Sequence, residues 1–179
     1  MKTLVTVLAG GRARRLGEPK PLADLRGAPL VAYPLAAAAA AGLEAVVVAK
    51  TGTALPPLDV PVWREPDEPV HPLLGIVTAL ERAQRAVLAV ACDMPFLTPD
   101  LLARLAVGPE AATAVEGHLE PFPARYEPAA LPALRTALTR GASLRATLAA
   151  LGPALIEIDD PRLVASVNTP ADLATARGG

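Results

Sequence analysis

The stretch Leu8-Ala9-Gly10-Gly11-Arg12-Ala13-Arg14-Arg15-Leu16-Gly17-Glu18-Pro19-Lys20 directly follows the first apolar run of the chain, Thr3 to Leu8. That run is continuous and rich in β-branched residues, which predicts a buried central strand. Two adjacent glycines let the backbone turn sharply and approach a ligand closely. The loop carries four cationic side chains, Arg12, Arg14, Arg15 and Lys20. A cationic glycine turn at the end of a buried strand is suited to binding phosphate.

The alternative is a solvated basic loop that only joins a strand to a helix. Two common phosphate motifs are excluded. The chain has no Gly-x-x-x-x-Gly-Lys-Ser/Thr sequence, so the loop is not a Walker A motif. It also lacks Gly-x-Gly-x-x-Gly, because Gly10 and Gly11 are adjacent and Gly17 lies too far along the chain.

The length of 179 residues and the hydrophobic content of 52% predict one globular domain with a substantial core. A net charge of -1 gives no general attraction to nucleic acid or to a membrane. Cys92 is the only cysteine, so no internal disulfide is possible and a reducing compartment is expected. No signal peptide is visible, and the longest uncharged stretch, Ala28 to Leu43, is shorter than the roughly 20 residues that span a bilayer. We therefore expect a cytoplasmic protein.

Helix and strand patterns alternate along the chain, which predicts an α/β fold with a mostly parallel sheet and helices on both faces. The expected strands are Thr3–Leu8, Glu44–Ala49, Val60–Arg64, Ala86–Ala91, Ala112–Glu116, Phe122–Arg125 and Ala154–Ile158. The expected helices are Leu30–Ala41, Leu73–Arg85, Thr98–Val107, Pro128–Leu138, Ser143–Leu151 and a terminal helix opened by a Thr169-Pro170-Ala171-Asp172 capping box.

The first turn resembles the signature of a known family. Leu8 to Lys20 matches, in register, the pattern Leu-Ala-Gly-Gly-x-x-x-Arg-(Leu/Met)-Gly-x-x-Lys of small nucleotidyltransferases of the molybdenum cofactor guanylyltransferase type. The resemblance implies a single-domain, Rossmann-like nucleotidyltransferase fold. In that family the loop wraps a nucleoside triphosphate, which makes Leu8, Ala9, Gly10, Gly11 and Lys20 candidates for nucleotide binding.

Lys20 and Arg15 are the candidate phosphate-neutralising catalytic residues. A lysine beside the phosphates would stabilise the charge that develops as pyrophosphate leaves, and a guanidinium grips phosphate with a bidentate fork. Lys20 is one of only three lysines in the chain. The alternative for Lys20 is an ordinary surface lysine.

Asp93 is the candidate metal ligand. It follows a predicted strand, at the carboxyl end where open α/β sheets place ligands, and Mg²⁺ usually takes one or two carboxylates together with phosphate and water. The segment Cys92-Asp93-Met94-Pro95-Phe96 is similar to the family's Cys-Asp-x-Pro-(Phe/Tyr) motif, whose aspartate binds the metal. The alternative is that Asp93 only caps the turn before Thr98.

An acidic loop precedes His71-Pro72-Leu73-Leu74-Gly75, and it resembles the family's Asp-(about six)-Gly-Pro-Leu-x-Gly stretch. The resemblance implies that Glu65 lies near the guanosine part of the nucleotide, with Asp67 as the alternative. The chain departs from the pattern, because glutamate stands for aspartate and His71 stands for the first glycine. We expect His71 to be structural.

The C-terminal third also follows the family in order, through Pro121–Tyr126, Gly141–Arg145 and Val167–Leu173. The resemblance implies an acceptor site near Asn168, the only asparagine in the chain, although helix capping would also explain Asn168-Thr169-Pro170. Arg145 is the candidate contact for an anionic acceptor, with Arg125 and Arg140 as alternatives. The single domain, 1–179, would thus comprise a nucleotide-binding part of about 1–107 and an acceptor-binding part of about 108–179.

The resemblance implies a Mg²⁺-dependent enzyme that transfers GMP from GTP to the terminal phosphate of molybdopterin and releases pyrophosphate, with transient contact to other molybdenum cofactor proteins. Gly11 favours the guanylyl branch, whereas Pro19-Lys20 is less typical of it. Cytidylyl transfer to molybdopterin and guanylyl transfer to a cobinamide phosphate remain alternatives. A nucleotide-binding regulatory module without turnover is the alternative from outside the enzymes.

Overall fold

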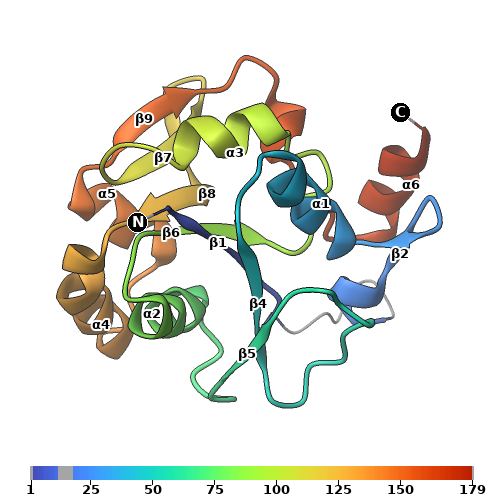
Figure 1. Ribbon diagram of the computed structural model, residues 1–179. Helices are drawn as coiled ribbons and strands as arrows, with labels where there is room; N and C mark the ends of the chain where they lie inside the picture. The colour runs from blue at the N-terminus through green and yellow to red at the C-terminus, as the bar shows by residue number, and fades with distance from the viewer. Residues whose placement is uncertain (1, 12–17, 179) are drawn as a thin grey trace.

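The computed structural model describes residues 2–11 and 18–178. Its central element is a seven-stranded sheet in the order β5-β4-β1-β6-β8-β7-β9 (Figure 1). The strands are β1 (Leu4–Leu8), β4 (Ala45–Lys50), β5 (Val62–Glu65), β6 (Val87–Ala91), β7 (Ala111–Val115), β8 (His118–Tyr126) and β9 (Ala154–Glu157). Strand β8 runs antiparallel to β6 and β7, and every other neighbouring pair of this sheet is parallel. The predicted α/β fold with a mostly parallel sheet is confirmed.

Strand β1 lies in the middle of the sheet, hydrogen-bonded to β4 on one side and β6 on the other. Val5 and Val7 are completely buried and belong to the core on one face of the sheet, whereas Leu8 packs against the core on the other face. Both faces of β1 are therefore covered, which is why its sequence is a continuous apolar run rather than an alternating one.

Helices cover both faces, as predicted (Figure 1). Helices α1 (Ala32–Ala40) and α3 (Pro99–Leu105) pack on one face, while α2 (Pro72–Ala83), α4 (Leu131–Thr139) and α5 (Leu144–Leu151) pack on the other. Two predicted helix starts are confirmed by their caps. The hydroxyl of Thr98 accepts the N–H of Leu101 at 3.3 Å, and the hydroxyl of Ser143 accepts the N–H of Ala146 at 3.2 Å.

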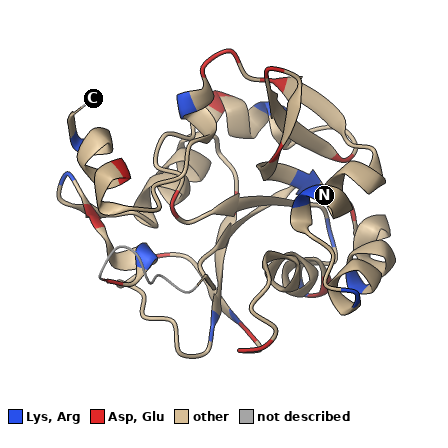
Figure 2. Cartoon of the chain, turned by 180° about the vertical axis from the view of Figure 1, so that it is seen from behind, with Lys and Arg blue, Asp and Glu red and all other residues tan. Residues whose placement is uncertain are grey.

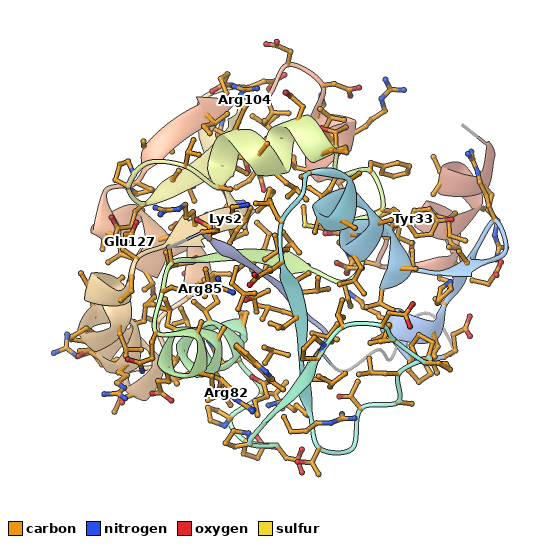
Figure 3. The ribbon with its side chains drawn as sticks, viewed as in Figure 1. Lys2, Tyr33, Arg82, Arg85, Arg104 and Glu127 are labelled. Atoms are coloured by element: carbon orange, nitrogen blue, oxygen red, sulfur yellow. The ribbon has the colours of Figure 1, made fainter. Side chains whose placement is uncertain are left out.

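The segment before α1 differs from the prediction. Instead of opening a helix, residues 24–29 form a small hairpin of β2 (Asp24–Leu25) and β3 (Ala28–Pro29), and α1 begins only at Ala32. The hairpin forms a third apolar cluster with helix α6 (Pro170–Gly178), which lies beside it in Figure 1. Tyr33, labelled in Figure 3, donates its hydroxyl hydrogen to the carbonyl of Leu25 and ties α1 to the hairpin. Short 3₁₀ turns complete the fold at Lys20–Leu22, Pro128–Ala130 and Pro161–Val164.

The strand order places a topological switch point at β1. The chain first builds outward from β1 to β4 and β5, and then returns to add β6 on the opposite side of β1. Open α/β sheets bind ligands outside the carboxyl ends of their strands at such a point. Gly10 follows β1 there and Asp93 follows β6, so two of the motifs that carry the family resemblance meet at this edge.

Charged residues lie mainly on the outside of the fold, and those buried within the described ranges are Lys50, Glu65, Asp93 and Arg125. Figure 2 shows Lys and Arg mixed with Asp and Glu rather than gathered on one side of the view. Within the described ranges, the helices are all too short or too polar to cross a bilayer.

Candidate active site

A cavity of about 180 Å³ lies at the carboxyl ends of β1, β4, β5 and β6. Six residues predicted to bind the nucleotide or the metal line it together: Leu8, Gly10, Gly11, Lys20, Glu65 and Asp93. They come from segments far apart in the sequence, and the parallel strands bring them to one edge of the sheet. The predicted phosphate contact of Arg15 falls on residues 12–17, which lie outside the described residues together with Arg12 and Arg14.

The glycine turn lies in close contact with the side chain of Glu65 in the cavity wall. A Cβ atom placed on Gly10 would lie 2.3 Å from Oε1 of Glu65, whereas one on Gly11 would meet no atom of the described residues within 4 Å. Gly10 is thus required for the close approach of the turn to Glu65, whereas no residue within the described ranges restricts a side chain at Gly11 in the same way.

Ala9 does not join the other residues of the turn in the cavity wall. Its N–H donates to the carbonyl of Val48 at 2.8 Å, and its side chain is buried in the core below the site. An amide that is engaged in the sheet has no hydrogen left for a nucleotide. Ala9 is thus not among the residues that line the cavity, its N–H extends the β1–β4 pairing, and a nucleotide contact at Ala9 stays a prediction.

Lys20, Asp93 and Asn168 form a polar cluster at one end of the cavity. The ammonium of Lys20 donates to Oδ2 of Asp93 at 2.6 Å and also to Oδ1 of Asn168. Asp93 is almost fully buried, and its other oxygen, Oδ1, has no hydrogen-bond partner among the described residues. Lys20 thus interacts specifically with the site rather than pointing freely into solvent, which argues against an ordinary surface lysine.

The segment that carries Asn168 is fixed at both sides of that residue. The N–H of Val167 donates to the main-chain carbonyl of Asp93 at 2.8 Å. The carboxylate of Asp172 accepts the N–H groups of Asn168 and Thr169 at 2.9 and 2.8 Å, and the N–H of Asp172 returns to the hydroxyl of Thr169 at 3.1 Å. The predicted capping box is confirmed. These bonds, the one from Asn168 foremost, lower the pKa of Asp172 below its ordinary value.

Glu65 and Lys50 form a second acid–lysine pair, which also lines the cavity. The Lys50 ammonium lies 3.3 Å from Oε1 of Glu65 and donates to the carbonyls of Pro66 at 2.7 Å and Pro69 at 3.3 Å. Burial raises the pKa of Glu65 above its ordinary value, and the charge of Lys50 and its hydrogen bond oppose that shift. Lys50 was not predicted as a site residue. Its place at the end of an apolar strand, in a chain with only three lysines, could have indicated it.

The other acidic candidate, Asp67, lies outside the cavity. It is exposed, and its Oδ1 accepts the N–H of Thr51 at 3.2 Å, so it shapes the loop. His71 caps α2, because its Nδ1 accepts the N–H of Leu73 at 3.2 Å, which agrees with the structural role expected for it.

Burial, with a smaller effect of the neighbouring Asp93 charge, raises the pKa of the Cys92 thiol to about 12. The thiol therefore stays protonated at neutral pH.

The arginines expected to meet an anionic acceptor are not among the residues that line this cavity. Arg125 is buried in the sheet, where it pairs with Glu127 at 2.6 Å and donates to the hydroxyl of Thr3 at 3.2 Å. Its guanidinium is thus a structural link across β8. Arg145 projects from α5 and contacts the carbonyl of Leu119 and, at 3.5 Å, the carboxylate of Glu120. Arg140 lies at the groove between α4 and α5.

The arrangement provides distinct chemical environments within one cavity. The pair of Lys50 and Glu65 is nearly closed to solvent, with side chains 10% and 4% exposed, whereas Lys20 is 23% exposed and can meet a ligand. Lys20 supplies positive charge beside the glycine turn. Asp93 supplies a carboxylate oxygen without a partner among the described residues. Within those residues, no three His, Cys, Asp or Glu side chains form a group that could hold a metal ion by themselves. A cation held here would therefore take most of its ligands from substrate and water.

Comparisons with known proteins identify the family of the chain. The sequence model of the MobA-like NTP transferase domain matches residues 5–155. The molybdenum cofactor guanylyltransferase of Rhodobacter capsulatus is 34% identical over 194 residues, which cover 98% of this chain and 95% of that protein.

Two solved structures share the fold. The molybdopterin-guanine dinucleotide biosynthesis protein A of Archaeoglobus fulgidus superposes with a TM-score of 0.81 at 23% identity, over 98% of this chain and 97% of that one. The 2-C-methyl-D-erythritol 4-phosphate cytidylyltransferase of Thermus thermophilus superposes with a TM-score of 0.74 at 23% identity, over 99% of this chain and 98% of that one. On the family match and the identity to the Rhodobacter protein, the chain belongs to the MobA-like molybdenum cofactor guanylyltransferase family and is a nucleotidyltransferase.

Proposed function

We propose that this enzyme transfers GMP from GTP to the terminal phosphate of molybdopterin. An oxygen of the acceptor phosphate attacks the α-phosphorus of GTP, a new phosphoanhydride bond forms, and the bond from the α-phosphorus to the bridging oxygen breaks. Pyrophosphate leaves with the electron pair of that bond. The acceptor is an anionic phosphate and already a nucleophile, so no general base is required.

The observation that carries the proposal is the pair of Lys20 and Asp93 in the same cavity as the glycine turn and Glu65, with Asn168 bonded to the Lys20 ammonium. In our assignment the phosphates lie against Gly10, Gly11 and Lys20. The base lies toward Glu65, whose buried Oε2 has no partner among the described residues and can accept an N–H. Guanine presents such donors at N1 and at its 2-amino group. Arg15 is assigned as a further phosphate contact.

The residues around Asp93 fit Mg²⁺. This ion prefers oxygen ligands and usually takes one or two carboxylates, with phosphate oxygens and water completing its coordination. Asp93 offers a buried carboxylate oxygen without a partner among the described residues, and Gly10 and Gly11 line the space for phosphates beside it. When bound, the ion would neutralise charge on the phosphates.

The protein's own contribution to the reaction is positioning and charge. Lys20, held by Asp93 and Asn168, places an ammonium where negative charge develops on the departing pyrophosphate, and a preorganised charge of this kind is effective inside a partly closed site. The acceptor approaches from the part of the chain after residue 107, which contributes Phe122 to the cavity wall and Asn168 to the cluster.

Nucleotide binding and pyrophosphate release test this proposal together. We expect GTP with Mg²⁺ to raise the Tm of the protein more than CTP, ATP or UTP. With molybdopterin present, wild-type enzyme should release pyrophosphate from GTP, whereas Asp93→Ala should remain folded by circular dichroism and release at least about 100-fold less. Full activity of Asp93→Ala with Mg²⁺, or GTP binding without pyrophosphate release by the wild type, would contradict the proposal.

A further inference from the structure

Lys50 is a buried cation of the cavity for which the proposed reaction has no use. It is the last residue of β4, and its side chain is 10% exposed. Its main-chain carbonyl accepts a hydrogen bond from the guanidinium of Arg64 at 2.7 Å, so the backbone is fixed as well as the side chain. Burying a lysine costs free energy unless its ammonium is fully hydrogen-bonded. The role of Lys50 therefore follows from the groups that its ammonium contacts and from what those contacts do.

The ammonium of Lys50 has no hydrogen left for a nucleotide. An ammonium carries three donors, and Lys50 directs them at three oxygens of its own protein: Oε1 of Glu65, the carbonyl of Pro66 and the carbonyl of Pro69. Lys20, in contrast, is the more exposed lysine and lies at the cluster with Asp93. Lys50 is therefore not a second phosphate-binding lysine, and its effect on a ligand must pass through the groups that it holds.

The principal group that Lys50 holds is the carboxylate of Glu65. Lys50 occupies Oε1, and a Cβ on Gly10 would lie only 2.3 Å from that same oxygen. Oε2 points toward Gly75 of α2, where a Cβ would lie at 3.2 Å, and it has no partner among the described residues. The carboxylate is thus held in one orientation, with one oxygen engaged by the protein and the other buried without a partner among the described residues.

Lys50 also forms part of the cavity wall through the loop after β5. The carbonyls of Pro66 and Pro69 belong to the segment that leads to Val70 and His71, and both of these residues line the cavity. One ammonium therefore fixes the acidic side chain at the end of β5 and the chain that follows it.

We propose that Lys50 is a positioning residue that holds Glu65 ionised and oriented, and thereby sets the preference of the site for guanine, whose ring N–H and neighbouring amino group are both donors, over adenine, whose amino group lies beside a ring nitrogen acceptor. The inference rests on the proposed guanylyl transfer and names a specificity residue for it. A protonated Glu65 would present a donor in place of an acceptor and would lose that preference.

The charges around Glu65 make this role measurable through pH. Lys50 is the charged group that faces Glu65 from β4, His71 at the start of α2 lines the same cavity, and Gly10 and Gly75 are uncharged. Burial raises the pKa of Glu65 and Lys50 opposes that shift. Removing the positive charge will raise the pKa further, so base recognition will be lost at a higher pH than in the wild type. His71 is the same in every variant.

The experiment measures dissociation constants of GTP and ATP between pH 6 and 8.5 for wild type, K50M, K50Q and K50R, with K2M as the matched control. Lys2 is exposed and precedes β1, at the opposite end of that strand from Gly10 (Figure 3). K50M should lose at least about tenfold of the preference for GTP over ATP at pH 7 and regain part of it as the pH rises. K50R should keep the wild-type pH profile, because it keeps the charge, and so should K2M.

K50Q keeps the inference testable if K50M does not fold, because glutamine still donates to the two proline carbonyls without carrying a charge. It should show the same alkaline shift of the pH profile. If the wild type prefers GTP and K50Q or K50M keeps both that preference and the wild-type pH profile, the role of Lys50 is overturned. The proposed base contact would then still stand. A wild type that binds GTP and ATP equally would overturn the proposed base contact and this inference with it.

Discussion

The ammonium of Lys20 lies 2.6 Å from Oδ2 of Asp93, although 73 positions separate the two residues in the sequence. The contact joins the turn after β1 to the turn after β6, across the switch point of the sheet. It places the candidate phosphate-binding cation beside the candidate metal-binding carboxylate. Each charge offsets the desolvation of the other, because an unpaired buried charge is strongly unfavourable.

Removing the charge of Lys20 should reduce turnover more than nucleotide binding. In Lys20→Met we expect kcat to fall by about 10²–10³-fold, the size of effect seen when one preorganised donor is removed from a developing negative charge. Steady-state pyrophosphate release at saturating GTP measures this, with Lys2→Met as the control for loss of a lysine elsewhere. A kcat within twofold of wild type would show that Lys20 does not act on the transition state.

Asn168 should act through Lys20 rather than only through the acceptor. Its Oδ1 accepts a hydrogen bond from the Lys20 ammonium, so Asn168→Ala frees the lysine to move. We expect kcat to fall about tenfold, with little change in the KM for the acceptor, since one well-placed hydrogen bond to a charged group contributes about 1.5–3 kcal/mol. If the KM for the acceptor rises instead and kcat is unchanged, Asn168 is an acceptor-binding residue, as its position in the family motif implies.

Gly10 and Gly11 are adjacent, but alanine should have very different effects at the two positions. A Cβ on Gly10 would collide with Oε1 of Glu65, which is buried and held by Lys50, whereas a Cβ on Gly11 meets none of the residues that the structure describes. We expect Gly10→Ala to cost about 1–3 kcal/mol of stability, as overpacking of a buried site commonly does. Thermal unfolding without nucleotide measures this, and an equal Tm for the two variants would contradict the close approach of Gly10 to Glu65.

The capping box of α6 should make stability depend on pH in the acid range. The pKa of Asp172 is lowered in the folded protein, chiefly by the N–H of Asn168, so its carboxylate stabilises the fold at pH values above its ordinary 3.8. That contribution is lost as the pH falls through the lowered pKa. Asp172→Asn should therefore have a lower Tm than wild type at neutral pH, with the difference narrowing below pH 3.8. A difference that is independent of pH would exclude this electrostatic origin.

The fold could be predicted because its strands are buried on both faces. Runs such as Val46-Val47-Val48 in β4 and Leu88-Ala89-Val90 in β6 are continuously apolar, and helix caps such as Thr98 mark where the next element begins. The hairpin of β2 and β3 was not predicted, because strands of two residues carry no periodicity. Its turn depends instead on a local hydrogen bond from the N–H of Gly27 to the carboxylate of Asp24 at 3.2 Å.

The candidate site could be predicted where a motif continues directly from a strand end, as at Gly10 and Asp93. Lys50 was missed because the direction of its side chain depends on the pairing of β4 with β5, which aligns Lys50 with Glu65. Arg145, with Arg125 as an alternative, was expected to face the acceptor. The sequence around an arginine does not show which group its guanidinium contacts, so this expectation could not be checked before the fold was known. The guanidinium of Arg125 contacts Glu127 and Thr3 within the fold, and that of Arg145 contacts Leu119 and Glu120 of β8.

The most direct test of the account is a competition between GTP and CTP, with molybdopterin as acceptor and Mg²⁺ present, in which the dinucleotide products are separated and quantified. We predict that the guanine dinucleotide forms in large excess and that Lys20→Met and Asp93→Ala each suppress it. Formation of the cytosine dinucleotide in preference, or of neither dinucleotide while GTP is bound, would contradict the assignment of this site as a guanylyltransferase centre.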